Sequence, residues 1–133
     1  MFYSCDFDST NRILRCHLKG RVTDGVLKDF FRISFQHAVS THPRAGIVDL
    51  SEVTSFEVSA QTIEELAKSA PVLHDSNLRR IVIASSPRIY GMMRMFEIEG
   101  EERRPNFHVV RTEREAWAIL AVQNPRFELL DMK

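Results

Sequence analysis

The sequence predicts an α/β fold in which an antiparallel hairpin precedes a mainly parallel sheet. Three observations predict it. The first residues form two alternating segments that match each other in a single register. Two later segments, Ala45 to Leu50 and Ile81 to Ala84, are short and apolar throughout, as strands buried on both faces are. Segments with helical spacing separate these strands, which implies right-handed crossovers in the order β-β-α-β-α-β-α-β-α, with about four helices.

The N-terminal hairpin is predicted from period-2 alternation on both of its strands. With the turn centred on Thr10 and Asn11, one face is apolar and the other is polar and charged. The apolar face pairs Tyr3 with Leu18, Cys5 with Cys16 and Phe7 with Leu14, and the other pairs Ser4 with His17 and Asp6 with Arg15. Two cysteines are too few for a disulfide scaffold, so we expect Cys5 and Cys16 to be buried, reduced neighbours, with a redox pair as the alternative.

The first two helices are predicted from their caps and apolar stripes. Thr23 or Asp24 suits the N-cap of a helix that ends near Thr41. The first stripe comprises Leu27, Phe30, Phe31, Ser34 and Ala38. After the strand from Ala45 to Leu50 we expect a polar turn and a second helix that begins near Ser59. Its stripe comprises Ile63, Leu66, Ala67, Ala70 and Leu73, although Pro71 must kink or end it.

The second half of the chain has sharper signals. The run "LRRIVIAS" is the clearest strand, and Ser86 before Pro87 is a specific start signal for a helix that reaches about Glu99. The inward face of that helix comprises Ile89, Met92, Met93 and Phe96. The short strand "FHVV" follows, and Thr112 with Glu115 forms a capping box for the last helix. Asn124-Pro125 ends it and leaves a tail over residues 123–133 that docks on the domain or frays.

Composition bounds the class of protein. A chain of 133 residues is the size of one domain, so we expect residues 1–133 to form a single unit. Its 18 basic and 18 acidic residues give a net charge of zero, which argues against a nucleic-acid-binding protein. We expect no transmembrane segment, because no apolar run approaches the roughly 20 residues that a bilayer requires. The N-terminus lacks the pattern of a signal peptide, and a cytoplasmic protein is the default expectation.

The order of elements and the residues at the strand ends resemble the STAS family of anti-sigma-factor antagonists. Within that family the chain is most similar to the SpoIIAA-like (STAS/SEC14-like) group. The stretches that carry the resemblance cover most of the chain from Gly20 to Leu120: "GRVTDGVLKDFF", "GIVDLSEVTSFEVSA" and "RRIVIASSPRIYGMMRMFEIEGEERRPNFHVVRTEREAWAIL". The resemblance implies a non-enzymatic domain that binds partner proteins, in some members under phosphorylation control, and in others nucleotides or lipids.

The resemblance also implies where a phosphorylation switch would lie. Regulated STAS domains carry Asp-Ser-Ser-Gly or Asp-Thr-Ser-Gly at the start of the helix after the "VDLS" strand. The same positions here are Glu57, Val58, Ser59 and Ala60, so Val58 replaces the phosphoacceptor and Ala60 the glycine. Ser59 is therefore a weak candidate for phosphorylation, and its alternative role is that of an N-cap.

The candidate anion site lies at the carboxyl end of the "LRRIVIAS" strand, where ligands usually bind in such sheets. Ser85, Ser86, Arg88 and the amides of the following helix could hold a carboxylate or phosphate, with Arg94, Arg103 and Arg104 approaching from the helix and the loop. The alternative is that Ser86 caps the helix and the arginines pair with the glutamates of the same segment, which are Glu97, Glu99, Glu101 and Glu102.

The helix "RIYGMMRMFE" is also richer in apolar residues than one core stripe requires. Tyr90, Met92 and Met95 are candidates for a surface that contacts a protein partner, a second copy of the chain or an acyl chain. The alternative is a thick core or a contact between two copies of the chain.

No catalytic motif is present, and no two histidines lie at a metal-ligand spacing on one helix face, so we expect neither a metal nor another cofactor. The sequence thus predicts a non-enzymatic STAS-like regulatory or interaction module without the serine switch. One alternative is a binder of a small apolar or anionic ligand, lipid or nucleotide, at the carboxyl edge of the sheet. The other is a small enzyme that uses the residues at the strand ends.

Overall fold

The computed structural model describes residues 3–73 and 78–130. Its elements in order are β1 (Tyr3–Asp8), β2 (Ile13–Thr23), α1 (Asp24–Thr41), β3 (Ala45–Glu57), α2 (Ala60–Lys68), β4 (Arg79–Ile83), α3 (Pro87–Glu99), β5 (Phe107–Val110), α4 (Glu113–Leu120) and β6 (Glu128–Leu129). The predicted α/β class and the predicted order up to α4 are confirmed. Strand β6 comes from the predicted tail, whose residues 131–133 lie outside the described part of the chain.

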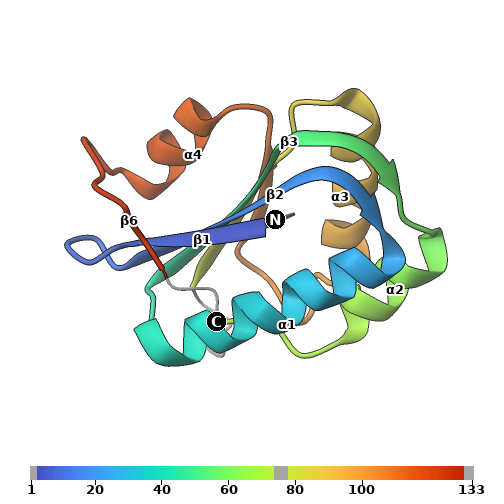
Figure 1. The fold of residues 1–133 in the computed structure, drawn as a ribbon, viewed down its shortest axis with the longest axis horizontal. Helices are drawn as coiled ribbons and strands as arrows, with labels where there is room; N and C mark the ends of the chain where they lie inside the picture. The colour runs from blue at the N-terminus through green and yellow to red at the C-terminus, as the bar shows by residue number, and fades with distance from the viewer. Residues whose placement is uncertain (1–2, 74–77, 131–133) are drawn as a thin grey trace.

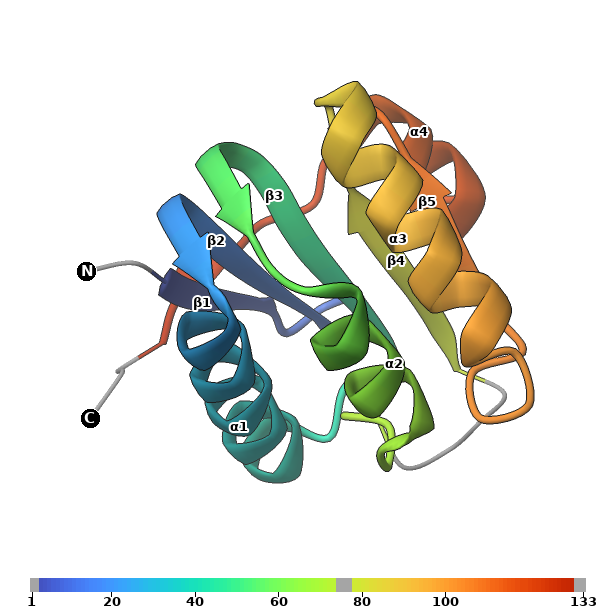
Figure 2. The same cartoon turned by 90° about the vertical axis from the view of Figure 1, so that its right-hand side faces the viewer.

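The six strands form one sheet in the order β5-β4-β3-β2-β1-β6. Strands β2 to β5 are parallel, and β1 is antiparallel to both β2 and β6. Each crossover advances one strand in the same direction, so right-handed connections place α1, α2 and α3 on one face of the sheet. These three helices lie side by side in Figure 2, and α4 lies behind the sheet. Figure 1 shows the same division, with α1 and α4 on opposite sides.

The hairpin has the predicted register. Cys5 faces Cys16, and every other predicted pair from Tyr3–Leu18 to Phe7–Leu14 is present. Both cysteines are free and buried, with their sulfurs 2.6 Å apart. The alternation placed them correctly because the apolar face of the hairpin packs beneath α1 in the main core.

A buried carboxylate closes the hairpin turn. Asp8 is 1% exposed and accepts hydrogen bonds from the backbone amides of Thr10 and Asn11 and from the Asn11 side chain. Its second oxygen also accepts from the amide of Arg126, 3.2 Å away in the C-terminal segment. Burial raises the pKa of Asp8, but these bonds outweigh that effect and the pKa is lowered. One side chain therefore holds both the turn and the segment that leads into β6.

The prediction of a polar turn directly after Leu50 is wrong. Strand β3 continues to Glu57, and its second half pairs with the second half of β2 as far as Thr23 and Glu57. Two register shifts, one on each side of Gly20, accompany this extension, and Gly20 has a φ of 76°, which glycine adopts readily. The sequence hid this strand because its outward side chains are acids and hydroxyls.

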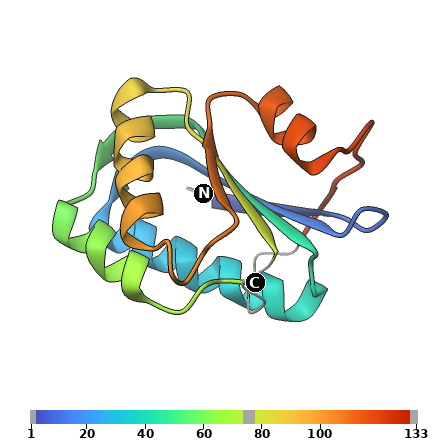
Figure 3. The same cartoon turned by 180° about the vertical axis from the view of Figure 1, so that it is seen from behind.

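The two faces of the sheet carry separate cores. The larger core lies beneath α1, α2 and α3, and the smaller one lies between β2 to β5 and α4, where Ala116 is fully buried. Seen from behind, α4 covers only part of the second face (Figure 3). Every helix in residues 3–73 and 78–130 is too short or too polar to span a bilayer.

Candidate functional site

The structure divides the predicted anion site between the two ends of α3. Ser85, Ser86 and Arg88 lie at the carboxyl end of β4, where α3 begins. Arg103 and Arg104 follow the other end of α3, about 20 Å away at 1.5 Å per residue. Arg94 lies between them and pairs with Glu97. The expectation of one site formed by all six residues is therefore wrong, because α3 runs back along the sheet.

At the start of α3, the charges are engaged with neighbouring groups. Ser86 occupies the N-cap position, but its hydroxyl makes no capping bond. Arg21 binds Glu57 with two hydrogen bonds of 2.6 and 3.0 Å and lowers the pKa of that carboxyl to about 2, and Arg88 adds to this effect. Arg88 thus lies near an acid of β3 rather than the predicted glutamates of its own segment.

Arg104 is buried rather than available to a ligand at the surface. The residue is only 5% exposed, and its guanidinium group donates hydrogen bonds to the carbonyls of Ala67, Leu66 and Ser69 at 2.8, 3.3 and 3.3 Å. Burial, and then the charges of Arg80 and Arg103, together lower the pKa of Arg104 to about 10. Arg104 therefore donates to the last carbonyls of α2, of which that of Leu66 also accepts from the amide and hydroxyl of Ser69.

The predicted partner surface on α3 is largely covered. Tyr90, Met92 and Met95 are half-buried and pack against the main core, and the Arg111 guanidinium lies 4.4 Å from the centre of the Tyr90 ring. Ile98 is the exposed large apolar residue of this helix, with 65% of its surface accessible. The excess of apolar residues in α3 thus serves mainly the core.

Ser59 is an N-cap, as its alternative role predicted. Its hydroxyl accepts a hydrogen bond from the Thr62 amide at 3.1 Å, and its own amide donates to Asp24 at 2.8 Å. The other Asp24 oxygen is 3.2 Å from the Ser59 hydroxyl, and Val58 is buried. A phosphate on Ser59 would meet this carboxylate, so the local electrostatics oppose phosphorylation.

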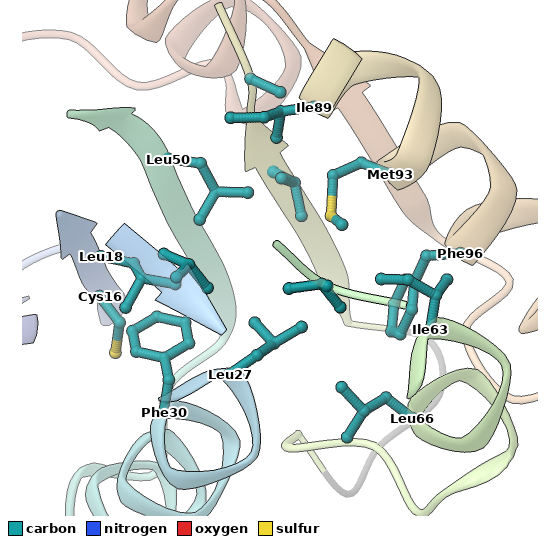
Figure 4. Close-up of a cluster of buried hydrophobic side chains, with 14 of the residues drawn as sticks. Cys16, Leu18, Leu27, Phe30, Leu50, Ile63, Leu66, Ile89, Met93 and Phe96 are labelled. Atoms are coloured by element: carbon teal, nitrogen blue, oxygen red, sulfur yellow. The ribbon is translucent and has the colours of Figure 1, made fainter. Parts of the chain in front are cut away.

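A cavity of about 100 Å³ lies between the sheet and the three helices. Leu27 of α1, Ile63 of α2 and Met93 of α3 line it, opposite Leu50 of β3. Figure 4 shows these four side chains pointing toward one another around a common space. Almost the whole wall is aliphatic or aromatic, so the site favours a small apolar molecule over an ion.

Three polar residues belong to the wall of this cavity. Arg80 and Arg104 lie at the end where β4 begins, and their guanidinium groups donate to backbone carbonyls, including that of Leu73 at 2.7 Å from Arg80. The third is Ser34 of α1, which is 4% exposed. Its hydroxyl lies beside the Cys16 thiol but forms no hydrogen bond that meets normal geometry.

Sequence reasoning missed this site, although two signals were present. Ser34 is a hydroxyl within an otherwise apolar stripe, and Arg80 alternates with Val82 of β4 and with Ala84 directly after that strand, both of which belong to the main core. A polar residue at an inward position marks a buried polar group, but the space beside it depends on how the helices pack.

A half-buried ionic cluster lies on the opposite face of the sheet. The His17 ring nitrogens are 3.6 Å from Asp6 and 3.4 Å from Asp49, and Arg15 contacts Asp6 at 2.7 Å and Glu113 of α4 at 3.3 Å. Hydrogen bonding to Asp49 and then Asp6 raises the pKa of His17 to about 9. Burial raises the pKa of Asp49, but hydrogen bonds from His17 and Ser51 outweigh it and lower that pKa to about 2. These charges satisfy one another and stabilise the fold.

The cavity can hold a molecule but has little means to transform it. Its wall contains no carboxylate or imidazole from the described residues, and burial raises the pKa of the Cys16 thiol well above its usual value. A general base and an activated nucleophile are therefore both missing from this wall.

Comparison of the chain with protein-family models and with curated proteins finds no match.

Proposed function

We propose that this chain is a non-enzymatic, STAS-like binding module that takes a small apolar molecule between its sheet and the helices α1 to α3. The observation that carries the proposal is the cavity of about 100 Å³ with an almost wholly apolar wall. Protein interiors are normally packed with few voids larger than a water molecule, so a cavity of this size is a specific feature. This site lies inside the domain, not at the carboxyl edge where the sequence placed a ligand.

The size of the cavity selects among the ligands that the sequence suggested. An engineered cavity of about 150 Å³ accommodates benzene, so a cavity of about 100 Å³ suits a molecule of roughly four to five non-hydrogen atoms. A nucleotide or a long acyl chain is far larger. The two buried arginines do not favour an anion either, because their donors are directed at backbone carbonyls.

The interaction role that the resemblance implies is compatible with this site. Helix α3, which was expected to contact a partner, is one of the three helices that line the cavity. A ligand between them and the sheet would fix their positions, and a partner protein or a second copy of the chain would then bind one state preferentially. Ligand binding and partner binding would thus be linked.

The proposal is tested by titrating the protein with cyclopentane and following its methyl groups by carbon–proton NMR. We expect saturable shifts at Leu27, Ile63 and Met93, which line the cavity. A titration that leaves these methyl signals unchanged would refute the proposal.

Two matched variants locate the binding. Val82→Met places a flexible side chain in the cavity, since Val82 lines it, and we expect this variant to lose the shifts. Ile83→Met makes a comparable change on the opposite face of the same strand, in the core beneath α4, and we expect it to bind as the wild type does. Equal binding by both variants would place the ligand elsewhere.

A further inference from the structure

Cys5 and Cys16 are two nucleophilic side chains that the fold buries in direct contact. They lie opposite each other on β1 and β2, and their exposed fractions are 0% and 2%. Both are free thiols, and their sulfurs are 2.6 Å apart. A single free cysteine is common in a protein core, but two in contact across one strand pair have the arrangement that a cross-link requires.

The backbone also places this pair where a disulfide between strands can form. The carbonyl of Cys5 accepts a hydrogen bond of 2.9 Å from the amide of Leu130, directly after β6. In an antiparallel strand the amide and the carbonyl of one residue point to the same side, so both groups of Cys5 point away from β2. Cys5 and Cys16 therefore form a non-hydrogen-bonded pair, whose Cα atoms are about 4.5 Å apart. This spacing lies within the range of about 4.4–6.8 Å that disulfides span.

The environment of the thiols slows their reaction but leaves a route to them. Burial raises the pKa of Cys16 well above its usual value, and the contact with Cys5 raises it further, whereas the adjacent Ser34 hydroxyl lowers it. The thiolate, which is the reactive form, is therefore scarce at neutral pH. In the part of the chain that the structure describes, only the two residues of β6 lie outside β1 at this edge of the sheet. Local opening of so short a strand costs less free energy than unfolding of the domain.

We propose that Cys5 and Cys16 are a site of reversible oxidation by hydrogen peroxide, which converts them into a disulfide that joins β1 to β2. One thiolate attacks a peroxide oxygen, the O–O bond breaks, and the hydroxide that leaves takes up a proton to become water, so that a sulfenic acid remains. The second thiol attacks the sulfenic sulfur, the S–O bond breaks, and the hydroxyl leaves with the thiol proton as a second water. Two thiols and one hydrogen peroxide thus give one disulfide and two water molecules. This inference is independent of the proposed function and goes beyond it.

The test is to treat the folded wild type with hydrogen peroxide, unfold it in urea with iodoacetamide, and measure its intact mass. The untreated protein should take up one alkyl group on each of its two cysteines. After oxidation we expect no alkylation and a mass lower by about 2 Da, because two hydrogen atoms are lost when the disulfide forms. Digestion should then give a linked pair of peptides that contain Cys5 and Cys16, and dithiothreitol should restore both alkylation sites.

The matched control exchanges two residues of β2, by Leu14→Cys together with Cys16→Leu. This variant has the same composition and keeps two cysteines on the apolar face of the hairpin, but it places them diagonally, about 7–8 Å apart, instead of directly opposite. We expect the folded variant to form the disulfide more than about tenfold more slowly than the folded wild type. In urea, where the hairpin is absent, the two proteins should form it at similar rates.

Three results would overturn the inference. The first is a peroxide-treated wild type that still takes up two alkyl groups. The second is a mass gain of about 32 Da, the sulfinic acid of a single cysteine, which would show that the second thiol does not capture the sulfenic acid. The third is an equal rate in the folded wild type and the folded exchange variant, because the disulfide would then reflect closeness along the chain. The wild-type masses decide the inference even if the exchange variant does not fold.

Discussion

The pH dependence of stability should depend on His17. The imidazole lies between Asp6 and Asp49, and its pKa is raised to about 9 in the folded protein, against an ordinary value of about 6.5. Because the folded pKa is above the unfolded one, the protonated ring stabilises the fold fully below about pH 6.5. This contribution is lost as the pH rises from about 6.5 to about 9.

The pKa difference and the exposure of His17 determine how much its protonated ring contributes to the free energy of unfolding. The difference between the two pKa values corresponds to at most about 3.4 kcal/mol. The His17 side chain is 20% exposed, and its contacts of 3.4 and 3.6 Å lie at the long end of hydrogen-bond distances, so each bond is weak. Solvent screening therefore reduces the expected contribution to about 1–2 kcal/mol.

The measurement is urea unfolding of the wild type and His17→Gln at about pH 6 and about pH 8.5. We expect the wild type to lose about 1–2 kcal/mol more than His17→Gln over this interval. The buried Cys16 thiol, whose pKa is raised, also lowers stability at alkaline pH, but it is present in both proteins and cancels in the difference. Parallel pH profiles for the two proteins would show that the carboxylates do not hold the imidazolium.

Three further predictions use matched pairs or single changes, each followed by urea unfolding. Arg104→Met should lower the free energy of unfolding by about 2–3 kcal/mol, because it leaves three carbonyls at the end of α2 without a charged donor. Arg103→Met, at an exposed position, should leave the free energy of unfolding almost unchanged, and similar losses in the two variants would contradict the capping role. Ser59→Ala should cost about 1 kcal/mol and Ser86→Ala much less, because only the first hydroxyl makes a capping bond. Asp8→Ala should cost about 2–4 kcal/mol by freeing the turn and the C-terminal segment, and a loss below about 1 kcal/mol would show that its four bonds are unimportant.

The sequence predicted the hairpin down to its register because a period of two on both strands allows only one pairing with all apolar side chains on one face. It failed at β3 beyond Leu50, where pairing with β2 depends on backbone hydrogen bonds that polar side chains do not reveal. Ser59 was identified as a cap because capping is local.

The candidate site could not be predicted in the same way. Ser34 was recognised as part of the inward stripe, but a stripe does not show which inward positions meet a neighbour and which meet a space. Arg104 was expected at the surface because arginine is rarely buried, and its acceptors are supplied by another helix, 37 residues away for Ala67. These properties arise from packing between elements, which periodicity does not encode.

The cavity can be traced to the short second helix. Helix α2 has nine residues and spans about 14 Å, whereas α1 has eighteen residues and spans about 27 Å. Helix α2 is short because Pro71 disfavours helical backbone at the residue before it. The helix therefore ends at Lys68, with Ser69 as its C-cap. Residues 69–73 then continue without helical structure and place Leu73 over Gly46, where an added Cβ would lie 3.3 Å from the Leu73 side chain.

An early helix end also creates the need for Arg104. The last carbonyls of α2 lie inside the domain, and Arg104 supplies their donors from the loop after α3. Arg104 also belongs to the cavity wall. The side chain that binds the last carbonyls of α2 therefore also encloses the space beyond the end of this helix. If this reasoning holds, Gly46→Ala should push Leu73 into the cavity and weaken cyclopentane binding with little loss of stability, because the neighbouring space allows Leu73 to move. Unchanged cyclopentane binding in Gly46→Ala would show that the end of α2 does not shape the site.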